Sequence, residues 1–71
     1  MSHNITGLRN QLERERKVTR EIAKVRQWIE DGRNVPTLLR DAIKFRPETL
    51  AMPIHYERFR TLVANTEGDL L

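Results

Sequence analysis

The side chains best suited to acid–base chemistry in this 71-residue sequence are His55 and Tyr56, which follow Pro53. A general base needs an orienting partner and a pocket, and no neighbouring residue pattern supplies either. The other histidine, His3, lies far away in the sequence, and Ser2 is the only serine. We therefore expect no catalytic residue, and we expect that the protein is not an enzyme.

Metal and cofactor chemistry also lack a sequence signal. The chain has no cysteine, which excludes disulfides and thiolate metal ligands. Asp31, Asp41 and Asp69 do not have the spacing of metal ligands, and three isolated glycines do not form a phosphate-binding loop. We predict neither a metal site nor a cofactor site.

A row of basic residues could instead contact the phosphates of a nucleic acid. On a helical wheel this row occupies one side of the first helix and consists of Arg9, Arg16, Arg20 and Lys24. Glu13 lies among them, and acidic and basic residues alternate at i, i+4, which stabilises a solvated helix by about 0.2–0.5 kcal/mol per pair. The net charge is only +3. The pattern favours a solvated face, with weak nucleic-acid binding as the alternative.

The basic row belongs to one long predicted helix, from about Asn4 to Asp31, which contains no proline. Ser2 or Asn4 could cap its start, and Gly32 stands where a left-handed residue often ends a helix. Gly7 weakens the first turns. At about 1.5 Å per residue the helix would be about 40 Å long, too long for the rest of the chain to cover.

The apolar residues of this helix form two stripes. Val18, Ile22, Val25 and Ile29 follow one another at spacings of 4, 3 and 4 and share one face, while Ile5, Leu8 and Leu12 lie on a rotated face. A seven-residue repeat fails at Gln11 and Glu15, so a long two-stranded coiled coil is not expected. We predict a core or self-association seam made of Leu8, Leu12, Val18, Ile22, Val25, Trp28 and Ile29.

Trp28 allows two interpretations. It lies beside Ile29, one turn before the predicted helix end, where the second helix should return over it through Leu39 or Ile43. This placement favours a core role. Tryptophan is also enriched among the residues that anchor protein interfaces, so an interface role is the alternative.

Two shorter helices should follow the first. Asn34 could cap the second helix, Pro36 suits its first turn, and Pro47 should end it by Phe45 or Arg46. Its predicted buried side consists of Leu38, Leu39, Ala42 and Ile43. Residues 48–52 could form a single turn.

The last helix is predicted from about Pro53 to Ala64, with residues 65–71 as a frayed tail. Its predicted buried side consists of Ile54, Phe59, Leu62 and Val63. No stretch alternates with a period of two, so no strand is expected.

One segment is similar to a known family. Residues 30–43, "EDGRNVPTLLRDAI", resemble the turn and second helix of ribbon-helix-helix DNA-binding proteins. The resemblance covers about a fifth of the chain and would imply DNA recognition by a short N-terminal strand. Residues 1–17 contain nothing strand-like, and the helix before the turn is too long, so no DNA-reading residue is carried over.

These patterns predict a single all-α domain over residues 1–71, frayed at 1–4 and 65–71, with a long N-terminal helix, two shorter helices and a small bundle completed by self-association. A core of this size rarely contributes more than about 3–5 kcal/mol of net stability, which favours association. The expected function is that of a small non-enzymatic interaction module, an adaptor, inhibitor or regulator, with itself and another protein as partners. Nucleic-acid binding is the alternative.

The cellular setting follows from what the sequence does not contain. It has neither an apolar run of about 18 residues nor the apolar core of a signal peptide, so we expect no membrane partner and a cytoplasmic protein. Small charged helical proteins without motifs are common among phage and mobile-element accessory genes. That link concerns a size class and does not come from particular residues.

Overall fold

One helix, α1 (Ser2–Glu30), runs along most of the molecule, whose extents are 48 × 17 × 17 Å. The computed structural model describes the backbone of residues 2–71 and the side chains of residues 7–71. Three further helices follow, α2 (Thr37–Ala42), α3 (Pro47–Leu50) and α4 (Pro53–Leu70), with no strand over these residues. The predicted all-α architecture, with a long first helix and shorter helices packed together, is confirmed.

The end of α1 follows the predicted glycine signal. Gly32 has a φ of 77°, in the left-handed region that glycine adopts without a Cβ clash. The N–H of Arg33 donates to the carbonyl of Trp28 at 2.9 Å, and the N–H of Gly32 donates to the carbonyl of Ile29 at 3.0 Å. This pair of bonds is a Schellman motif, which satisfies the last carbonyls of the helix and turns the chain back.

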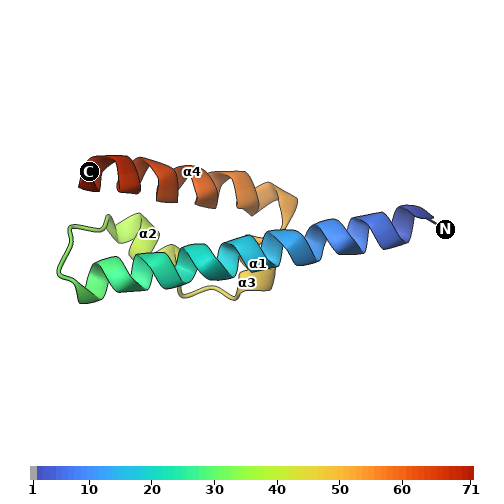
Figure 1. Cartoon of the computed structure of the whole chain (residues 1–71), viewed down its shortest axis with the longest axis horizontal. Coiled ribbons are helices and arrows are strands. Elements are labelled where there is room, and N and C mark those ends of the chain that lie inside the picture. The colour runs from blue at the N-terminus through green and yellow to red at the C-terminus, as the bar shows by residue number, and fades with distance from the viewer. Residues whose placement is uncertain (1) are drawn as a thin grey trace.

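The chain then returns along α1 through α2 and α3, and α4 runs parallel to α1 (Figure 1). Three contacts set this register. Arg14 Nε donates to the carbonyl of Ala51 at 2.8 Å, Lys24 pairs with Glu67 at 3.4 Å, and an Arg33 guanidinium N–H donates to the carbonyl of Leu70 at 3.3 Å. The part of α1 before Arg14 extends beyond the other helices (Figure 1).

The core fills the space between α1 and the returning chain. Three residues of the predicted seam, Val18, Ile22 and Val25, are buried in it. The rest of the chain contributes Val35, Leu39, Ile43, Leu50, Ala51, Phe59 and Val63. The core therefore lies under the C-terminal half of α1, and residues 7–10 of that helix are exposed.

The short middle segment is built as expected from its prolines. The helix α2 ends at Ala42, and backbone hydrogen bonds continue to Phe45, whose N–H donates to the carbonyl of Ala42 at 3.1 Å. Pro47 then starts the single turn of α3, where a missing N–H is harmless. The predicted cap at Asn34 is wrong, because the N-cap of α2 is Pro36 and no side chain caps it.

Three other expectations are also wrong. Leu38 and Ile54 were expected in the core and are 66% and 70% exposed. Leu39 and Phe59, which were predicted to be buried with them, are in the core. The last helix does not end at Ala64 but continues to Leu70, and Thr66 on it is 4% exposed. The contacts of Glu67 and Leu70 with α1 and its following loop hold these extra turns in place.

The N-terminal expectations lie partly outside the described residues. The proposed cap at Ser2 or Asn4, the side chain of Ile5 and that of His3 belong to the residues whose side chains are not described. Fraying at 1–4 and 65–71 stays a prediction. Over the described part of the chain, no helix combines the length and the apolar character needed to cross a membrane.

Candidate functional site

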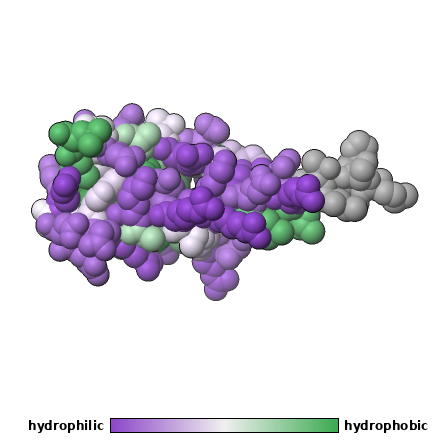
Figure 2. Space-filling model, viewed as in Figure 1, coloured by the Kyte–Doolittle hydropathy of each residue, from purple (hydrophilic) through white to green (hydrophobic). Residues whose placement is uncertain are grey.

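The predicted seam divides into three parts. Val18, Ile22 and Val25 belong to the core, and Trp28 and Ile29 are partly buried against its edge. Leu8 and Leu12, in contrast, are 65% and 48% exposed on the part of α1 that extends beyond the other helices. We call Leu8 and Leu12 the α1 stripe. The face in Figure 2 is mostly hydrophilic, with hydrophobic surface beside the grey N-terminal residues and at the C-terminal end.

Of the four residues in the predicted basic row, one forms ion pairs with other residues of the described chain. Arg9, Arg16 and Arg20 are exposed, and none has an acidic partner within salt-bridge distance among residues 7–71. Lys24 differs, because its ammonium group lies 3.8 Å from Glu21 and 3.4 Å from Glu67. Lys24 therefore joins α1 to α4, and three arginines remain to form a basic surface.

A larger apolar surface lies between α2 and α4, and sequence reasoning did not predict it. A hollow of about 320 Å³ opens there, flanked by adjoining hollows of about 360 and 120 Å³ that share its lining. Its apolar walls are Leu38, Ala42, Phe45, Leu50, Phe59 and Leu62. We call this surface the α2–α4 groove. His55, Glu57 and Arg58 stand at its polar edge.

The groove exists because α2 has two apolar faces. Leu39 and Ile43 point into the core, while Leu38 and Ala42, four residues apart, form an adjacent face that is rotated from the first by about 100°. Phe45, which follows the last turn, is 59% exposed. One face of so short a helix can be covered by this chain, and the other remains an uncovered wall. An apolar groove of this kind suits an amphipathic helix.

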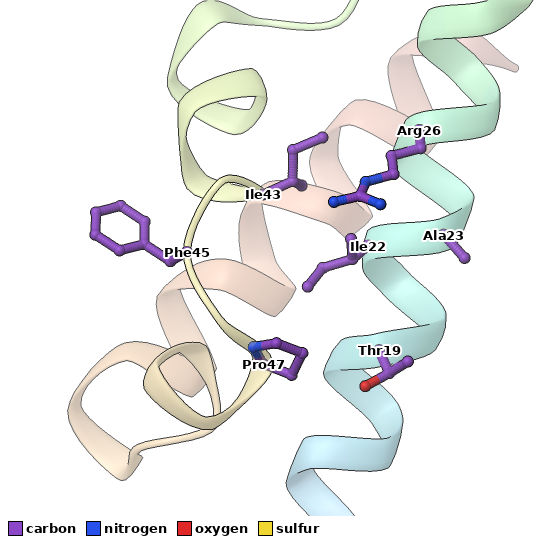
Figure 3. A pocket seen from close by; sticks show the side chains of 7 residues that line it. All are labelled: Thr19, Ile22, Ala23, Arg26, Ile43, Phe45 and Pro47. Atoms are coloured by element: carbon purple, nitrogen blue, oxygen red, sulfur yellow. The ribbon is translucent and has the colours of Figure 1, made fainter.

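A smaller hollow of about 290 Å³ lies on another side, between α1 and the link from α2 to α3. Figure 3 shows Arg26 reaching from α1 toward Ile43, with Ile22 also on α1, Pro47 on the facing segment and the ring of Phe45 turned away. The hydroxyl of Thr19, at the rim, donates to the carbonyl of Glu15 at 2.8 Å. The hollow thus offers one guanidinium over apolar walls and no set of groups arranged for acid–base chemistry.

The other candidate groups for chemistry are dispersed. His55 lies at the edge of the α2–α4 groove, Asp31 accepts a bond from Gln27 at 3.0 Å, and Asp41 pairs with Lys44 at 3.4 Å. Within the described residues, no three His, Asp or Glu side chains gather where a metal ion could be held. The described residues therefore offer the α1 stripe and a row of arginines, both on α1, and the α2–α4 groove for binding.

Comparison of the chain with protein-family models, with curated proteins and with solved structures gives no match. The functional argument therefore rests on the chain's own surfaces. One sequence signal could have indicated the α2–α4 groove. The run Leu38–Leu39 with Ala42–Ile43 places apolar residues on too wide an arc for a six-residue helix to bury entirely.

Proposed function

We propose that this chain is a small, non-enzymatic protein–protein interaction module of the cytoplasm, of the adaptor, inhibitor or regulator kind, which self-associates through the first part of α1. One observation carries the proposal. Leu8 and Leu12 share a face of a helix that extends beyond its own core, and they are 65% and 48% exposed. Covering such a stripe with a second protein surface removes apolar area from water, at about 25 cal/mol per Å².

The size of the chain supports the same proposal. A core of ten buried hydrophobic residues stabilises a monomer only modestly, and association adds stability by mass action. The proposal assigns Val18, Ile22 and Val25 to folding and leaves Leu8 and Leu12 for assembly.

Sedimentation equilibrium tests the self-association. We expect the full chain to be oligomeric at tens of micromolar, roughly the range of modest association. Leu12→Glu should make it monomeric, because it places an unpaired charge in the contact. Lys17→Gln is the matched control, because it changes the net charge by the same amount on the opposite side of α1. A folded wild-type monomer at this concentration would refute self-association.

The alternative function is nucleic-acid binding by α1. Its support is the exposed arginines Arg9, Arg16 and Arg20, which have no acidic partner among residues 7–71. Three phosphate contacts give only weak, sequence-independent affinity that falls with salt. Exchange of Arg16 and Arg20 for Glu distinguishes this function from the first, because it removes phosphate contacts and leaves Leu8 and Leu12 unchanged.

A further inference from the structure

We propose that the α1 stripe of one copy docks into the α2–α4 groove of a second copy. This inference rests on the proposed self-association and names the surface that receives the stripe. The alternative geometry, in which two stripes pack against each other, would leave both grooves uncovered. The two geometries make different predictions for mixtures of variants.

Shape is the first argument. The stripe is convex, with Leu8 and Leu12 one turn apart and 65% and 48% exposed on the part of α1 that extends beyond the other helices (Figure 1). The groove is concave, about 320 Å³ in volume, with apolar walls from two helices. A helix that lays leucines at i and i+4 into an apolar groove is a recurring mode of recognition.

The chain cannot make this contact within one molecule. α1 is continuous from Ser2 to Glu30, and it first meets the returning chain at Arg14, which bonds to Ala51. The part of α1 before Arg14 extends beyond the other helices (Figure 1), and Leu8 and Leu12 belong to this part. A second copy can bring the two surfaces together.

Charge is the second argument. On the helical wheel, Arg9 and Arg16 lie on one edge of the stripe and Glu15 lies on the other. Two exposed residues of opposite sign, Glu57 and Arg58, stand at the edge of the groove on α4, and neither has an ion pair within residues 7–71. The arginine edge of the stripe can thus meet Glu57 on α4. Two facing stripes offer no such pairing in an antiparallel arrangement, because arginine edges would meet.

Mixing two variants tests the inference in solution. The first, Leu12→Glu, has a damaged stripe and an intact groove. The second, Leu38→Glu, has a damaged groove and an intact stripe, and it should fold because Leu38 is 66% exposed. Each alone should dissociate at least about tenfold more readily than the wild type. Their equimolar mixture should form a one-to-one dimer, because one intact stripe then meets one intact groove.

The outcomes separate the inference from the proposed function. If the wild type is monomeric, self-association fails and the inference fails with it. If the wild type associates and Leu38→Glu associates equally well, self-association stands and the groove assignment is overturned. A mixture in which Leu12→Glu stays monomeric also overturns it. Ile54→Glu, at an exposed position outside the lining of the groove, is the control and should associate as the wild type does.

Crosslinking supplies a second readout that leaves the apolar residues of the stripe and of the groove unchanged. The chain has no cysteine, so single cysteines can be introduced at Arg16, beside the stripe, and at Thr61, on the groove wall. A short bismaleimide should join an Arg16→Cys chain to a Thr61→Cys chain in a mixture. Preferential joining of two Arg16→Cys chains would show stripe-to-stripe packing and overturn the inference. Circular dichroism of each variant confirms that it is folded.

Discussion

Arg14 donates from Nε to the backbone carbonyl of Ala51 at 2.8 Å and so joins α1 to the segment between α3 and α4, 37 positions further along the chain. A second guanidinium N–H of Arg14 donates to the side-chain oxygen of Gln11 at 2.8 Å, which holds the arginine in place. This bond lies near the point where α1 emerges from the other helices (Figure 1). Before it, residues 7–10 of α1 are exposed, and after it α1 contributes Val18, Ile22 and Val25 to the core.

Arg14→Met should therefore lower the free energy of unfolding by about 1–2 kcal/mol, because it leaves the carbonyl of the fully buried Ala51 without its charged donor. The methionine keeps much of the apolar stem. Urea denaturation measures the loss. Arg16→Met, two residues away and exposed, is the control and should change stability by no more than about 0.5 kcal/mol. Equal effects at the two positions would contradict the bond.

Two adjacent leucines test how α2 is oriented. Leu39 is fully buried, and Leu38 is 66% exposed. Leu39→Ala should cost about 2–5 kcal/mol, enough to unfold much of a domain of this size, while Leu38→Ala should cost no more than about 0.5 kcal/mol. Thermal melts followed by circular dichroism compare them. A larger effect at Leu38 would mean that α2 is rotated relative to this structure.

The difference between these leucines also explains what sequence patterns could and could not predict. The spacing of Val18, Ile22 and Val25, and the glycine after α1, depend on local geometry, and both predictions hold in the structure. Which side of α2 faces inward depends on how the chain leaves the Gly32 turn and where Pro47 breaks it, and that is a tertiary property. The groove, which needs α2 and α4 placed side by side, could not be derived from either helix alone.

Alanine substitutions at Gly32 and Gly68 should change the stability of the fold in opposite directions. Gly32→Ala should destabilise the fold by about 1–2 kcal/mol, because alanine resists the left-handed conformation at a φ of 77°. Gly68 lies within α4, and a Cβ there would meet nothing within 4 Å. Gly68→Ala should therefore stabilise by up to about 1 kcal/mol. Chemical denaturation measures both. No gain at Gly68 would indicate that residues 65–70 fray, as the sequence predicted.

Trp28 separates a folding role from a binding role. It is partly buried and packs against the core, and its carbonyl accepts the Arg33 bond that ends α1. Trp28→Ala should lower the melting temperature, with a loss below the roughly 3–5 kcal/mol of a fully buried tryptophan. Trp28→Phe is the control and should recover most of the stability. A melting transition that Trp28→Ala leaves unchanged would assign this side chain to an interface instead.

The arginines of α1 give a quantitative prediction for the alternative function. If Arg9, Arg16 and Arg20 each contact a phosphate, the logarithm of affinity for duplex DNA should fall against the logarithm of salt with a slope of roughly −3. Fluorescence anisotropy with a labelled duplex measures this slope. Arg16→Glu together with Arg20→Glu should abolish binding. Arg46→Glu together with Arg60→Glu makes the same change in net charge away from α1 and should reduce binding less. A sequence-specific complex that survives physiological salt would make nucleic-acid recognition the better supported function.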